Sequence, residues 1–241
     1  MPLTFEQAVE IQPTYRPKDP EVLRALADIS MAAFCGPTAV GKNYLMRLAG
    51  YPIVGTVTTR APRPSDENYR YVSTSQLLGE IEGGRVVQFG TNPDAQTIYA
   101  SDLQAYIPNS VNAMDVFTDS VDDLSELGYK AVKPIGVVAT VNDWERRLDE
   151  RFTDLSPHQI RSRLIEAERA LRIISQWGGR PDKLLVLSRS ELDDKNKGLI
   201  LDFVQEGAHD NPQDDALQTI DDMLVTIPRF TKKYLKKDVI S

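Results

Sequence analysis

The sequence has few of the residues that form disulfides and zinc centres. It contains one cysteine, Cys35, and two histidines, His158 and His209. No internal disulfide can therefore form, and a zinc site built from cysteine and histidine is not expected. No apolar run reaches the length of a membrane-spanning helix, and residues 1–6 do not resemble a signal peptide. We therefore expect a cytoplasmic protein that does not bind a membrane.

Basic residues are also fewer than acidic residues. The chain has 28 lysines and arginines against 35 acidic residues, which gives a net charge of −7. This charge argues against nucleic-acid binding through bulk attraction. Hydrophobic residues make up 41% and charged residues 26% of the 241 positions, which is typical of a globular protein. The length suits one large domain or a core with inserted subdomains, whereas the oligomeric state cannot be predicted.

One stretch carries most of the functional information. An apolar run at 31–35 has the character of a buried strand, and residues 44–49 have the apolar spacing of a helix. Between them lies the pattern G-x-x-x-x-G-K. A strand, a glycine-rich turn and a helix in this order predict a phosphate-binding loop, in which backbone N–H groups and the lysine bind a polyphosphate. The predicted ATP-binding residues are Gly36, Pro37, Thr38, Ala39, Val40, Gly41, Lys42 and Asn43.

The residue after the lysine departs from the usual pattern. A serine or threonine hydroxyl normally holds Mg²⁺ at this position, but here it is Asn43. A carboxamide oxygen can also bind Mg²⁺, directly or through water. The alternative is that Asn43 caps the following helix. That alternative would weaken catalysis without preventing nucleotide binding.

The remaining elements follow from periodicity and from turn residues. Residues 1–28 form an N-terminal extension, with a helix opening at Asp19-Pro20 that we expect to pack on the core. Residues 206–241 are expected to form a C-terminal tail, whose basic cluster is either a nucleic-acid or membrane contact or, as we favour, a solvated segment. Predicted strands lie at 53–60, 69–73, 85–90, 97–101, 133–141 and 183–188, and predicted helices at 74–81, 121–128, 142–148, 156–171 and 198–204.

Several motifs taken together resemble guanylate kinase, a P-loop nucleoside monophosphate kinase. They are residues 36–42, the run VTTRAPRP at 57–64, YRYVS at 69–73, YAS at 99–101, RLDERFTD at 147–154 and IRSRL at 160–164. The resemblance spans about residues 31–205. It implies a three-layer α/β/α fold with a parallel sheet in a domain at 29–205. It also implies a β-rich insert for the nucleoside monophosphate at 55–103 and a helical lid at 142–170.

The resemblance also implies roles for individual residues. Lys42 and the lid arginines Arg147, Arg151 and Arg163 would stabilise the phosphoryl group during transfer. Two arginines three residues apart in a proline-containing run, Arg60 and Arg63, would by themselves be interpreted as surface charges, but beside a phosphate loop they suit a clamp on the acceptor phosphate. The full set implied for the nucleoside monophosphate is Thr56, Arg60, Arg63, Tyr69, Gln88, Tyr99 and Ser101.

The departures from the family lie in the base pocket. Gln88 and Phe117 stand where the family has carboxylates that bind guanine, so guanine specificity is not secured. Asp115 is retained and is expected to act on Mg²⁺, directly or through water. Its alternative role is that of a loop carboxylate or a helix cap.

We therefore expect Mg²⁺-dependent phosphoryl transfer from ATP to a nucleoside monophosphate, with GMP or dGMP as the first candidate. A kinase of another phosphorylated acceptor, such as ribose bisphosphate, is the second hypothesis. A catalytically weak guanylate-kinase-like binding module is the third.

Overall fold

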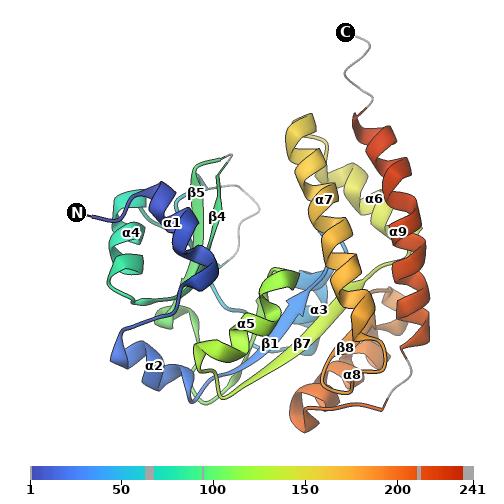
Figure 1. The fold of residues 1–241 in the computed structure, drawn as a ribbon. Coiled ribbons are helices and arrows are strands. Elements are labelled where there is room, and N and C mark those ends of the chain that lie inside the picture. The colour runs from blue at the N-terminus through green and yellow to red at the C-terminus, as the bar shows by residue number, and fades with distance from the viewer. Residues whose placement is uncertain (1, 63–67, 94, 211–212, 236–241) are drawn as a thin grey trace. The chain divides into compact units, whose positions relative to one another are not determined.

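The computed structural model describes residues 2–62, 68–93, 95–210 and 213–235 (Figure 1). The chain divides into two compact units. Unit 1 consists of residues 1–31, 51–113 and 123–132, and unit 2 of residues 32–50, 114–122 and 133–241. The predicted phosphate loop thus belongs to unit 2, and the predicted insert at 55–103 belongs to unit 1.

A four-stranded sheet with the order β6-β1-β7-β8 forms the centre of the α/β fold. Its strands are β1 (Ser30–Cys35), β6 (Val111–Asp115), β7 (Ala131–Val138) and β8 (Leu184–Leu187). β7 and β8 run parallel, with Ile135 opposite Leu184. The almost continuous apolar runs SMAAFC and LLVL are typical of parallel strands that are covered on both faces. The predicted α/β class is confirmed, as are the strands predicted at 31–35, 133–141 and 183–188.

The helices of unit 2 form packed pairs. α3 (Lys42–Ala49) packs against α8 (Asp193–Glu206), and α7 (Pro157–Ile174) packs against α9 (Asp214–Leu235). Ser156 caps α7 by accepting a hydrogen bond from the Gln159 N–H. The helix predicted at 142–148 is α6 (Val141–Arg151), and its cap is Thr140 rather than Asn142, the residue at the predicted start. Thr140 takes that position because its hydroxyl reaches the Asp143 N–H.

The C-terminal segment differs from the solvated tail that we expected. Residues 214–235 form α9, which packs against α7, α6 and β8 (Figure 1). Its buried face is Ala216, Ile220, Met223, Ile227, Phe230 and Tyr234. These side chains recur every three or four residues, which makes the segment an amphipathic helix that completes the core. Lys236 and Lys237 of the predicted basic cluster lie outside the described residues.

Unit 1 contains a second sheet, with the order β3-β2-β5-β4. Its strands are β2 (Thr56–Thr58), β3 (Tyr69–Tyr71), β4 (Val86–Asn92) and β5 (Thr97–Asp102). β2 pairs with β3 in parallel and with β5 antiparallel. The strand predicted at 53–60 is shorter than expected because the chain changes partner within it: Ile53 bridges Ala113, and only residues after Gly55 join the second sheet.

The N-terminal extension packs within unit 1. α1 (Phe5–Ile11) buries Phe5 and Ala8 in an apolar cluster with Leu77, Ile81 and other residues of α4 (Thr74–Glu82) and the second sheet. α1 was not predicted, although Thr4 and Gln7 form a capping box at its start. α2 (Pro20–Leu26) is capped by Asp19 as predicted. The short α5 (Val121–Leu124) continues into a 3₁₀ turn that ends before Gly128. None of the helices in the described residues has the length and apolar character needed to cross a bilayer.

Candidate functional site

The phosphate loop connects β1 to α3. Gly36 and Gly41 both have positive φ angles, 129° and 103°. A Cβ on Gly36 would lie 2.3 Å from the carbonyl oxygen of Val137 on β7, so the loop can approach the sheet only with glycine there. Ala39 also adopts a positive φ of 65°, which is uncommon for a residue with a side chain. Strained backbone of this kind is found at sites where the loop must present its amides to a ligand.

Lys42 is held against the loop and a neighbouring carboxylate. Its Nζ donates to the carbonyl oxygens of Gly36 at 2.6 Å and Pro37 at 3.0 Å. The same nitrogen lies 3.5 Å from Oδ1 of Asp115, the last residue of β6. The lysine side chain is only 12% exposed. A charge held in this position at the start of α3 can bind the outer phosphates of a nucleotide.

Asp115 lies among protein atoms yet stays open to solvent. Its side chain is 49% exposed. Loss of solvation raises the pKa of its carboxyl group, and this effect is only partly offset by the positive charges of Lys42 and Arg151. Its ion pair with Lys42 supports the predicted role at the loop rather than that of a helix cap.

A second carboxylate belongs to the same region. Glu166 on α7 has its pKa raised by loss of solvation, while Lys42 and Arg163 act in the opposite direction. Asp115 contributes a further increase through charge repulsion. Glu166 is not among the predicted site residues, because its only signal in the sequence is a position three residues after Arg163 on a helix. The positive charge of Arg151 thus acts on the pKa of the Asp115 carboxyl group, and that of Arg163 on the pKa of the Glu166 carboxyl group.

Arg147, one of the three predicted lid arginines, contacts the loop itself. Its Nη1 donates to the carbonyl oxygen of Val40 at 2.8 Å. The guanidinium therefore binds the backbone of the phosphate loop itself. One turn earlier on α6, the indole nitrogen of Trp144 donates to the carbonyl oxygen of Thr38 at 2.9 Å. Trp144 is not among the predicted site residues, because its only signal in the sequence is its spacing from Arg147.

Asn43 lies exposed in the first turn of α3. The residue that caps this helix is Gly41, with no side-chain hydrogen bond, so the alternative in which Asn43 is the cap is wrong. The described residues hold no group of three or more His, Cys, Asp or Glu side chains placed to bind a metal. Mg²⁺ that arrives with a nucleotide needs only one or two protein oxygens. The oxygens of Asn43 and Asp115 are of the right chemical type.

The predicted acceptor residues lie in unit 1. The guanidinium carbon of Arg60 sits 4.7 Å from the ring centre of Tyr69, and Arg60 Nη1 donates to the Ala61 carbonyl at 2.9 Å. Arg60 is only 9% exposed. Strand pairing sets Thr56 opposite Tyr69 and Tyr99 opposite Thr58. The second sheet thus brings these residues onto neighbouring strands, whereas Arg63 lies outside the described residues.

The residues assigned to the base pocket have mixed surroundings. Gln88 pairs with Ser101 across β4 and β5, next to an irregularity in the register. Ser101 is fully buried, and its hydroxyl lies 2.7 Å from that of Tyr106. Phe117, which belongs to unit 2, is 55% exposed. A hydrophobic side chain so exposed beside Asp115 cannot supply the hydrogen bonds that a carboxylate would offer to guanine.

Comparisons with known proteins bear on the fold. No protein-family model matches the chain, and no curated protein matches it. Among solved structures, the chain is similar to the crystal structure of guanylate kinase from Anaplasma phagocytophilum, with a TM-score of 0.50 and 12% sequence identity. The similarity covers 84% of this chain and 95% of that chain. The chain therefore has a guanylate-kinase-like P-loop fold.

Proposed function

We propose that this protein transfers a phosphoryl group from ATP to a nucleoside monophosphate. The observation that carries the proposal is the position of Lys42. Its ammonium group is held over the carbonyls of Gly36 and Pro37 and 3.5 Å from Asp115. A lysine in that place is what binding of the donor polyphosphate requires.

The donor side of the reaction uses residues of unit 2. Loop amides between Gly36 and Gly41 would bind the phosphates together with the N-terminus of α3. Asn43 and Asp115 would hold the Mg²⁺ that accompanies ATP, which neutralises charge on the phosphates. Arg151 and Arg163 would stabilise charge on the transferred group, whereas Arg147 would act through the loop backbone that it binds.

The acceptor side of the reaction uses residues of unit 1. Arg60, stacked on Tyr69, offers a planar fork of N–H donors to the acceptor phosphate. Thr56, Tyr99 and Arg63 complete the proposed phosphate group. Gln88 is the proposed contact to the base, with the buried Ser101 paired to it on β5. The acceptor phosphate is already an oxyanion, so the protein needs to position it rather than deprotonate it.

GMP or dGMP is the first candidate acceptor, on the likeness of the fold. A different phosphorylated acceptor, such as ribose bisphosphate, is favoured by one observation: Phe117, which is 55% exposed, offers no partner for a guanine edge. A binding module without turnover is disfavoured by the charges gathered around Lys42, because a pure binding surface has no need of them.

A coupled assay of ADP release with MgATP, run with each (d)NMP and with ribose bisphosphate, tests the proposal. We expect one class of acceptor to raise ADP release well above the rate with ATP alone. Arg60→Lys should raise KM for that acceptor at least about tenfold, because lysine lacks the planar fork, and leave the Kd of MgATP unchanged. If no acceptor stimulates ADP release while MgATP binds, the kinase function is refuted and the binding module replaces it.

A further inference from the structure

Two side chains of α6 hydrogen-bond to the backbone of the phosphate loop. The indole of Trp144 donates to the Thr38 carbonyl at 2.9 Å, and Arg147 donates to the Val40 carbonyl at 2.8 Å. Trp144 is completely buried. The two side chains are one helical turn apart, so they leave the same face of α6. Any displacement of α6 would therefore be transmitted to the backbone of the loop.

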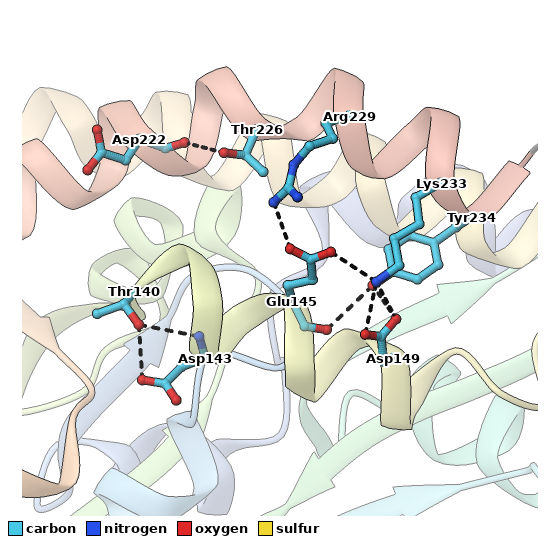
Figure 2. A network of polar contacts seen from close by, with 9 residues as sticks. All are labelled: Thr140, Asp143, Glu145, Asp149, Asp222, Thr226, Arg229, Lys233 and Tyr234. Atoms are coloured by element: carbon cyan, nitrogen blue, oxygen red, sulfur yellow. Dashed lines mark hydrogen bonds and ion pairs between the residues drawn. The ribbon is translucent and has the colours of Figure 1, made fainter.

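The opposite side of α6 is bound to α9 by a network of charges (Figure 2). Arg229 Nη2 lies 2.6 Å from Glu145 Oε2, and Lys233 Nζ lies 2.9 Å from Glu145 Oε1. The same lysine nitrogen is 2.7 Å from Asp149 Oδ1, to which the Tyr234 hydroxyl donates at 2.9 Å. Two carboxylates of α6 are thus shared among three side chains of α9.

Aromatic rings connect the two helices beneath this network. Phe230 of α9, which is fully buried, meets Trp144 edge to face with ring centres 5.2 Å apart. Tyr234 meets Phe152 in the same way at 5.1 Å. Edge-to-face pairs of this kind have a defined geometry. The Trp144 ring therefore packs against Phe230 of α9, while its indole nitrogen donates to the loop.

The network lies at the surface, since the side chains of Arg229, Lys233 and Asp149 are 57%, 39% and 50% exposed. A single exposed ion pair contributes little, whereas several charges in one network can contribute more. The least exposed member is Glu145, at 21%. Its hydrogen bond from Lys233, and to a lesser extent that from Arg229, lowers the pKa of the Glu145 carboxyl group. Several charges act together here in one arrangement, and such a group orders the helices more than a single exposed pair does.

We infer that α9 is a positioning element for nucleotide binding: Arg229, Phe230, Lys233 and Tyr234 fix α6, and α6 fixes the carbonyls of Thr38 and Val40 in the phosphate loop. The inference rests on the proposed function, since it assumes that the loop binds ATP. The four α9 residues are positioning residues, because they act on the loop only through α6. α6 is accordingly a fixed support of the loop rather than a moving part of the predicted lid.

A pair of neutral isosteres tests this inference on the full-length chain. Glu145→Gln combined with Asp149→Asn removes the charges on α6 while leaving the aromatic contacts in place. Glu150→Gln is the matched control, because Glu150 lies on the same helix and its ion pair is with Arg146 of α6 rather than with α9. Two measurements are made on each variant: the Kd of MgATP and the solvent exchange rate of the Trp144 indole N–H.

The exchange rate of the Trp144 indole N–H reports on its hydrogen bond to the loop, and it can be measured in the absence of nucleotide. The chain has two tryptophans, so Trp177→Phe identifies the Trp144 resonance. We expect the double variant to raise both the indole exchange rate and the Kd of MgATP at least about threefold, and Glu150→Gln to change neither. Lys233→Met should act in the same direction, and Lys233→Arg should restore wild-type values. Lys233→Met also serves if the double variant does not fold.

Unchanged values in Lys233→Met and in a folded double variant would overturn the inference. A wild-type protein that does not bind MgATP would refute the proposed function instead. In that case the indole exchange rate would still show whether α9 controls the loop.

Discussion

The Nζ of Lys42 lies 3.5 Å from the carboxylate of Asp115. The two residues are far apart in the sequence and come from the start of α3 and the end of β6. The ion pair favours the charged form of Asp115, yet loss of solvation outweighs it and raises the pKa of this carboxyl group. A carboxyl group with a shifted pKa beside a lysine is often part of a functional site.

Lys42→Ala should abolish turnover without unfolding the protein. The variant removes the charge aimed at the donor phosphates, and loss of one such stabilising group typically lowers kcat by about 10²–10³. The carbonyls of Gly36 and Pro37 lose their donor in this variant, and both residues are buried, so we expect some loss of stability in a chain that still folds. The coupled ADP assay and the circular dichroism spectrum check the two expectations.

Lys197→Ala on α8 is the control for that experiment. Lys197 is an exposed lysine outside the proposed site. It should keep wild-type turnover. Full activity in Lys42→Ala would refute the assignment of the donor site.

Asp115→Asn should stabilise the protein at neutral pH. Because the folded state raises the pKa of Asp115 above its ordinary value of 3.8, ionisation is harder in the folded than in the unfolded chain. Stability from this group is complete below the unfolded pKa and is lost as pH rises through the folded pKa. The asparagine variant has no carboxylate to ionise, so its advantage in urea unfolding should be present at pH 7 and shrink as pH approaches 3.8.

The same substitution should weaken binding of MgATP, since it removes the proposed oxygen ligand for the metal. Asp154→Asn, at an exposed carboxylate beyond the end of α6, should change neither property. A lower stability of Asp115→Asn at pH 7 would show that the ion pair with Lys42 outweighs the loss of solvation.

The sequence predicted the loop well because every signal for it is local. The apolar run before Gly36, the two glycines and the lysine all lie within about ten residues, and each favours the same strand, turn and helix. The strands and most helices followed from period and caps in the same way. The pairing of Lys42 with Asp115 could be anticipated only through the resemblance to a known family.

The parts that the sequence did not predict depend on distant contacts. The prediction of a solvated tail rested on the basic residues of α9, such as Arg229 and Lys233, which lie on its charged face. The helix also has an apolar face, whose partners are on α6, α7 and β8. Arg147 has the spacing of a lid residue, but Val40, which it binds, lies in the loop. Helical periodicity shows which face of a helix is buried, but it does not show which other helices or strands pack against that face.

Gly36→Ala should destabilise the protein much more than Gly50→Ala. Both glycines have positive φ, so each variant carries backbone strain of about 1–2 kcal/mol. A Cβ at Gly50 meets nothing within 4 Å, whereas a Cβ at Gly36 meets the Val137 carbonyl at 2.3 Å. We expect a loss above about 3 kcal/mol for Gly36→Ala, measured by urea unfolding. Equal losses in the two variants would show that the loop can move away from β7.

The last prediction concerns the buried hydroxyls of Ser101, Tyr106 and Tyr129. Their oxygens form a chain, 2.7 Å from Ser101 to Tyr106 and 2.8 Å from Tyr106 to Tyr129. Tyr106→Phe removes the middle member and leaves both neighbours without this partner. It should lower the free energy of unfolding by about 1–3 kcal/mol, whereas Ser101→Ala should lower it by about 1 kcal/mol. Because the two residues share one contact, the double variant should lose less than the sum of the two.

The kinetic measurement decides what Ser101 does in the proposed acceptor site. If its hydroxyl acts only through Tyr106, Ser101→Ala and Tyr106→Phe should leave KM for the acceptor within about twofold of wild type. If the hydroxyl binds the base, Ser101→Ala should raise KM about tenfold or more, with little loss of stability. The complete burial of Ser101 and its contact with Tyr106 favour the first outcome, in which base selection depends on Gln88 and on residues outside the predicted set.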